Sequence, residues 1–179
     1  MVVDPSRSAH GRAVAIAVSV LALLLSPSLL VSQAGTTYDR ATVDEAGQLH
    51  ILTADQREIV PPKDTDQVGF SLPAISEDRE AVGWLALYPN CCTSYPIPLK
   101  LVVYAKGQVH TFTGADLPVW KWRFEAGGAQ VAFEQETVHG GFGVHYELRD
   151  IASDRLLDQF EPTDSGPLPG WVRALEATQ

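Results

Sequence analysis

The sequence predicts an antiparallel all-β protein with a short C-terminal helix. After residue 35, short runs of β-rich residues are separated by turn residues at regular intervals. Helical periodicity is nearly absent from the same part of the chain, except close to its end. Segments of similar pattern also recur at an offset of about 49 residues. We therefore expect two tandem four-stranded units followed by a helical tail.

Residues 1–34 are expected to form a signal peptide. Arg7 and Arg12 precede an apolar run over residues 13–31, and Ser32-Gln33-Ala34 places small residues where a signal peptidase cleaves. Cleavage after Ala34 would export the protein to the periplasm or the extracellular space. An uncleaved run would instead anchor the N-terminus in a membrane, because it is nearly long enough to span a bilayer.

The charge of the chain excludes two classes of partner. The sequence has 13 basic and 22 acidic side chains, and its net charge of −9 becomes about −10 once residues 1–34 are removed. Such a surface repels nucleic acid backbones and anionic lipid. We therefore expect no nucleic acid and, after cleavage, no membrane as partner, which leaves an unknown protein or a small ligand.

The remaining chain divides into three parts. Residues 35–67 are expected to form an N-terminal hairpin and a polar loop, and residues 68–164 a two-repeat β domain. Residues 165–179 form a tail that begins with Pro and Gly and contains a short helix. The apolar residues of that helix, Trp171, Val172 and Leu175, are expected to cover a sheet edge.

Seven runs of the β domain have the pattern of strands. They cover residues 80–88, 99–104, 108–113, 119–125, 129–136, 143–151 and 155–160. The second and third runs are joined by a turn and are expected to form a hairpin. The run over 119–125 alternates cleanly. In the run over 143–151, one face is expected to carry Val144, Tyr146 and Leu148, and the other face His145, Glu147 and Arg149.

The two repeats resemble a known family. ISEDREAVGWLALY, which starts at Ile75, aligns with FEAGGAQVAFEQET, which starts at Phe124. The second copy continues into YELRDIASDRLLDQF, which contains the turn pattern D-x-A-[ST]-x-x-L that the first copy lacks. Over residues 68–161 these segments resemble blades of TolB/WD40-like β-propellers. The resemblance implies four-stranded blades that serve as binding platforms. Two blades are too few to close a propeller, so we expect a sandwich or partial propeller, or a ring completed by several chains.

The cysteines of the chain, Cys91 and Cys92, are adjacent in the loop LYPNCCTSYPIP. Adjacent Cα atoms lie about 3.8 Å apart, which is below the usual range of about 4.4–6.8 Å for disulfides, so a bond between them closes a strained ring. Four states remain open: a vicinal disulfide formed after export, two reduced cysteines of which at least one is buried, pairing between chains, and a soft-metal site.

A candidate binding or redox loop follows from the alignment of the two repeats. The cysteine loop joins the second and third strands of its copy, and residues 137–142 take the same place in the other copy. If the copies stack, both loops leave one edge, and their side chains cluster: Tyr88, Asn90, Cys91, Cys92, Tyr95, His139 and Phe142. The alternative is two ordinary loops, one stiffened by prolines and one rich in glycine.

No catalytic constellation stands out in the sequence. The histidines are not spaced as zinc ligands, and the serines lie outside any nucleophile-elbow motif. We therefore expect no cofactor and no metal, and favour an exported β domain that acts as a binding or structural module. The alternative is a thiol redox or soft-metal-responsive protein that uses Cys91 and Cys92.

Overall fold

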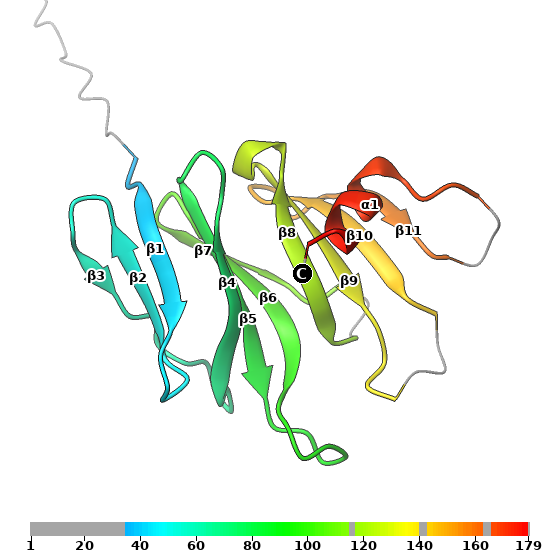
Figure 1. Ribbon diagram of the computed structural model, residues 1–179, viewed down its shortest axis with the longest axis horizontal. Coiled ribbons are helices and arrows are strands. Elements are labelled where there is room, and N and C mark those ends of the chain that lie inside the picture. The colour runs from blue at the N-terminus through cyan, green and yellow to red at the C-terminus, as the bar shows by residue number, and fades with distance from the viewer. Residues whose placement is uncertain (1–34, 115–116, 140–142, 163–165, 179) are drawn as a thin grey trace, which may run out of the picture. The chain divides into compact units, whose positions relative to one another are not determined.

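The computed structural model describes residues 35–114, 117–139, 143–162 and 166–178. The predicted signal peptide and Phe142 lie outside the described residues. Within these ranges the chain forms three antiparallel sheets and a short C-terminal helix, which confirms the predicted fold class (Figure 1). No helix in the described part of the chain is long and apolar enough to cross a membrane.

Each sheet is built from strands that are consecutive in the chain. The N-terminal sheet contains β1 (Tyr38–Val43), β2 (Leu49–Thr53) and β3 (Glu58–Ile59). The central sheet contains β4 (Gly69–Ile75), β5 (Ala81–Tyr88), β6 (Ile97–Ala105) and β7 (Gln108–Phe112). The C-terminal sheet contains β8 (Val119–Glu125), β9 (Gln130–Gln135), β10 (His145–Asp150) and β11 (Leu156–Phe160), and the helix α1 is Gly170–Glu176. A short 3₁₀ turn, Ala126–Gly128, joins β8 to β9.

The central and C-terminal sheets are two consecutive four-stranded meanders, as the repeat predicted. The aligned residues occupy equivalent places. Val82 and Trp84 lie on β5 and pack toward the N-terminal sheet, whereas Val131 and Phe133 lie on β9 and pack toward the central sheet. The second strand of each unit thus directs its matched side chains toward the preceding sheet. The likeness to propeller blades stays a prediction.

Three details differ from the sequence-based expectation. The segment 35–67 forms a three-stranded sheet, because β3 adds to the expected hairpin. The first strand of the central sheet, β4, is not among the seven predicted runs, and its register is irregular between Ser71 and Ala74. The alternation predicted for residues 119–125 is interrupted by a register shift between Val119 and Lys121. Bulges of this kind insert a residue into one strand and change which face the following side chains occupy.

One face of the central sheet packs closely against the C-terminal sheet. The buried cluster between them consists of Ala81, Leu85, Leu101, Val103, Phe112, Val119, Trp122, Val131, Phe133 and Ile151. The Trp122 ring lies over Gly83, where a Cβ atom would come within 2.4 Å of the ring. Its indole N–H donates to the carbonyl of Leu72 at 3.0 Å. Gly83 is therefore needed for the close approach of the two sheets.

The opposite face of the central sheet packs against the N-terminal sheet. This second buried cluster consists of Tyr38, Leu49, Ile51, Phe70, Val82, Trp84, Ala86, Tyr88 and Val102. The central sheet is thus covered on both faces, and its inner strand β5 is buried along nearly its whole length. Near-continuous apolar sequence such as AVGWLALY is typical of a strand that is buried on both sides.

The helix α1 covers a face of the C-terminal sheet. Its residues Val172 and Leu175 are fully buried and pack with Ala132 of β9 and Tyr146 of β10. Both strands are interior to the sheet, but α1 also lies against the edge strand β8, where Arg123 donates to the carbonyl of Ala174 at 2.9 Å. Trp171 does reach the edge strand β11, where its indole N–H donates to Asp158 at 2.8 Å.

The two predicted faces of β10 are confirmed. Val144, Tyr146 and Leu148 belong to the cluster beneath α1. On the other face, the buried carboxylate of Glu147 hydrogen-bonds with both neighbours, with His145 Nε2 at 3.1 Å and Arg149 Nε at 2.5 Å.

Candidate binding cleft

A cleft lies between the N-terminal sheet and the central sheet. The two sheets approach each other at β1 and β4, and the cleft opens on the side of β3, β6 and β7. The N-terminal sheet has three strands in the described part of the chain, one fewer than the central sheet, and its outer strand β3 has two residues. Residues 60–67 therefore cross this part of the central sheet as a loop. The resulting cavity has a volume of about 570 Å³.

The lining of the cleft is largely apolar and aromatic. The central sheet supplies Trp84, Ala86, Tyr88, Lys100, Val102, Tyr104, Val109 and Thr111. The opposite wall comes from β3 and the loop that follows it, with Ile59, Val60, Pro61, Pro62, Lys63, Asp64 and Gln67. A cavity of this size with an apolar lining and a few polar groups is typical of small-molecule sites.

The aromatic side chains of the cleft are held in place by their packing. The Trp84 ring meets Phe70 edge-on, with centroids 6.4 Å apart. The Tyr104 ring lies 6.1 Å from that of Tyr38 in a tilted arrangement. Trp84 and Tyr88 come from alternate positions of β5 and so share one face of the sheet. A ligand would therefore meet a largely preformed aromatic surface.

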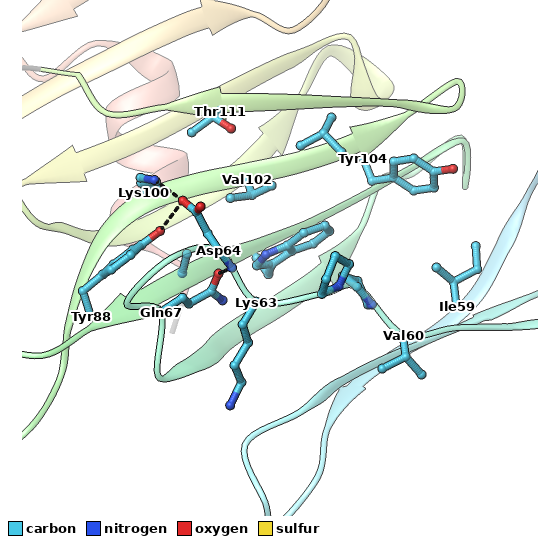
Figure 2. A pocket seen from close by; sticks show the side chains of 15 residues that line it. Ile59, Val60, Lys63, Asp64, Gln67, Tyr88, Lys100, Val102, Tyr104 and Thr111 are labelled. Carbon is cyan, nitrogen blue, oxygen red and sulfur yellow. Dashed lines mark hydrogen bonds and ion pairs between the residues drawn. The ribbon is translucent and has the colours of Figure 1, made fainter.

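One end of the cleft carries a polar group of three side chains (Figure 2). The Lys100 ammonium lies 2.5 Å from Asp64 Oδ2, and the Tyr88 hydroxyl donates to the same oxygen at 3.1 Å. The Lys100 ammonium also lies 5.1 Å from the centroid of the Tyr88 ring, within the range of a cation–π contact. We call Asp64, Tyr88 and Lys100 the polar triad of the cleft.

The polar triad shifts the pKa of each of its members. The hydrogen bond from Lys100, supported by those from the Thr65 backbone and Tyr88, lowers the pKa of the Asp64 carboxyl. The hydrogen bond with Asp64 in turn raises the pKa of Lys100. Burial raises the pKa of the Tyr88 phenol. At neutral pH the cleft therefore presents a carboxylate, an ammonium and a neutral hydroxyl beside its apolar wall.

The residues of the predicted site that the structure describes lie in different surroundings. Tyr88 lines the cleft, while the following loop carries Cys91 and Cys92 on the protein surface, and Tyr95 is also exposed. His139 is exposed in the connection from β9 to β10. Phe142 lies outside the described residues. The clustering of all seven side chains on one edge stays a prediction.

The cysteine loop is braced by its own hydrogen bonds. Asn90 accepts from the backbone N–H of Cys92 at 3.3 Å and donates to the Thr93 hydroxyl at 3.1 Å. Thr93 in turn donates to the carbonyl of Tyr95 at 2.6 Å. The two sulfur atoms lie 2.6 Å apart and belong to free, exposed cysteines. This exposure rules out the state in which at least one reduced thiol is buried.

The structure gives no support to a metal centre. In the part of the chain that it describes, no group of three or more His, Cys, Asp or Glu residues is arranged to hold a metal ion. One cluster of titratable side chains lies beneath α1, where Lys121 Nζ is 2.8 Å from Glu134 and 2.9 Å from Glu176. This cluster joins the helix to β8 and β9, so its evident role is structural.

Sequence reasoning missed most of the cleft. The sequence pattern places Trp84, Lys100 and Tyr104 in strands but gives none of them a place in a site. The alternation of Trp84, Ala86 and Tyr88 places them on one face. The pair Pro61-Pro62 shows that the opposing chain leaves the sheet. These two signals together could have suggested an aromatic face without a covering strand.

No family model matches the chain, and the search of curated proteins finds no relative of significant similarity.

Proposed function

We propose that this protein is a binding module whose ligand is a small amphipathic molecule held in the cleft between the N-terminal and central sheets. The apolar body of the ligand packs on Trp84, Val102 and Tyr104, and a polar group of the ligand contacts the polar triad. The protein acts as a carrier or sensor rather than as an enzyme. We further propose that it works after export, on the basis of the signal-peptide pattern in residues 1–34.

The observation that carries this proposal is that part of one face of the central sheet is covered by a loop and not by strands. Its aromatic face lies beneath a loop with two prolines, beside a cavity of about 570 Å³. An apolar ligand that enters this cavity removes its own surface and that of the lining from water, which contributes about 25 cal/mol for each Å² of apolar surface buried. The polar triad supplies both a donor and an acceptor that fix the orientation of the ligand.

The proposal is tested by filling the cleft with a side chain. The probe is anilinonaphthalene sulfonate, an amphipathic dye whose fluorescence rises in apolar surroundings. Thr111→Trp places an indole at the open side of the cleft, and we expect it to weaken dye binding at least about tenfold, equivalent to about 1.4 kcal/mol. Circular dichroism and thermal unfolding establish that the variant is folded.

A matched control uses the same substitution away from the cleft. Thr42 is an exposed residue of β1 that pairs with His50 in the N-terminal sheet. Thr42→Trp adds an exposed indole without filling the cavity, so the dye should bind this variant as tightly as the wild-type protein. Equal dye affinity in the wild-type protein and Thr111→Trp would show that the cleft is not the binding site.

A further inference from the structure

We propose that Cys91 and Cys92 form a reversible dithiol–disulfide site whose co-reactants are low-molecular-weight disulfides and thiols. This inference goes beyond the cleft and does not depend on ligand binding there. It rests on the position of the two sulfur atoms, on their exposure, and on the braced loop that carries them.

The sulfur atoms are close enough to react with each other. Their separation of 2.6 Å compares with about 2.05 Å in a disulfide, so a bond requires only a small local movement. Both side chains are exposed, and a dissolved disulfide can therefore reach them. The hydrogen bond with Cys91 raises the pKa of the Cys92 thiol.

The loop holds this pair on a short and well-defined connection. The loop is closed by the pairing of Tyr88, the last residue of β5, with Ile97, the first residue of β6. Asn90 and Thr93 brace its interior, and Pro89 and Pro96 restrict its backbone. Reaction between the two thiols is consequently favoured over reaction with a second molecule, because the partner is already in place.

The reaction balances in two exchange steps. The thiolate of one cysteine forms a bond to one sulfur of the dissolved disulfide, whose S–S bond breaks and releases one thiolate. The other cysteine then loses its proton and bonds to the sulfur of the first, which breaks the mixed disulfide and releases the second thiolate. The cysteine pair has been oxidised by two electrons, and the reagent has been reduced to two thiols. A strained ring of this kind is readily reopened by excess thiol, so the site is reversible.

The test follows these steps by intact mass. The purified, fully reduced protein is incubated with glutathione disulfide. We expect wild-type protein to lose two hydrogen atoms without keeping a glutathione adduct, and dithiothreitol to restore the starting mass. In Cys91→Ser and Cys92→Ser the second thiol is absent, so each variant should accumulate a stable adduct with one glutathione. The double variant should not react.

A trivalent arsenical that bridges two thiols gives an independent readout. Phenylarsine oxide should bind the reduced wild-type protein in a 1:1 ratio, and should bind neither the oxidised protein nor either single variant stably. Thermal unfolding of the variants should match that of the wild-type protein, because both side chains are exposed. Stable addition of two glutathiones to wild-type protein, or disulfide-linked dimers as the main product, would overturn the proposal.

Discussion

The two faces of the central sheet differ in how completely a neighbouring sheet covers them, although they are formed by the same four strands. One face is closed by the C-terminal sheet, and its cluster includes side chains that are fully buried, such as Leu101, Val103 and Phe133. The other face is closed where β1 and β2 pack against β4 and β5, and toward β6 and β7 it borders the cleft. The difference follows from the number of strands in the covering sheet, which is four on the closed side and three, within the described residues, on the side of the cleft.

The comparison teaches that a cleft can form where the covering sheet has fewer strands than the sheet that it covers. The C-terminal sheet has the same order of strands as the central sheet, and side chains of its strands β8 and β9 pack against β5, β6 and β7 in a closely packed interior. The N-terminal sheet ends with the short β3, and two prolines follow. Proline lacks the N–H that a further strand pairing needs. The aromatic side chains of β5 and β6 then line a cleft between the two sheets.

The largest expected loss of unfolding free energy comes from a substitution on the closed face of the central sheet. Phe133 is fully buried and packs against Phe112, with ring centroids 6.3 Å apart. Phe133→Ala should lower the free energy of unfolding by about 3–5 kcal/mol, because it removes a buried ring and leaves a cavity. Urea unfolding measures this loss. As a control, Val109→Ala at the open rim should stay within about 0.5 kcal/mol of wild type, since Val109 is 64% exposed.

A smaller loss of unfolding free energy is expected for substitutions at two neighbouring positions of β6, one on each face of the central sheet. Val103 lies in the cluster of the closed face, whereas Val102 lines the cleft. Val103→Ala should cost about 2 kcal/mol, since it loses two buried methyl groups and leaves a void. Val102→Ala should cost about half as much, because the space beside it already borders a cavity. Urea unfolding of both variants would show equal losses if the cleft were as closely packed as the opposite face.

The alternation of residues was enough to predict the sheets, but not their irregularities. Seven strands of the β domain were located because β-rich runs such as EAVGWLALY and VWKWRFE stand between turn residues. The register shifts at Leu72 and Trp120 could not be predicted in this way, because they depend on contacts between residues that are far apart in the sequence. Leu72 takes a positive φ of 47°, and its carbonyl accepts the indole N–H of Trp122, which is 50 residues away in the sequence.

The candidate site was predictable only in part, for a related reason. The adjacency of Cys91 and Cys92 is a local property, and it is visible in the sequence. The cleft joins Asp64 to Lys100, which lies 36 residues further along the chain, and it exists because the N-terminal sheet stops short. The sequence contains no pattern that directly signals a position where a sheet has fewer strands than the sheet it faces. Only the two prolines and the alternating aromatics of β5 point toward it.

The smallest expected effect is the contribution of the Asp64 carboxylate, at the polar end of the cleft, to the pH dependence of stability. The pKa of Asp64 is lowered, chiefly by its hydrogen bond from Lys100. The folded protein therefore binds this proton less tightly than the unfolded chain does. The resulting stabilisation is present above the ordinary pKa of aspartate, about 3.9, and is lost as the pH falls through the lowered pKa. Asp64→Asn removes this contribution at every pH.

The difference in melting temperature between wild-type protein and Asp64→Asn should therefore be small and constant near neutral pH, and should vanish in acid. Asp66→Asn, at an exposed position of the same loop, controls for the loss of one negative charge. A wild-type advantage over Asp64→Asn that persists unchanged in strong acid would show that the ion pair with Lys100 does not hold the cleft loop. The polar end of the cleft would then have to be held by the uncharged contacts of the loop, such as the hydrogen bond from Gln67 to the carbonyl of Gly69.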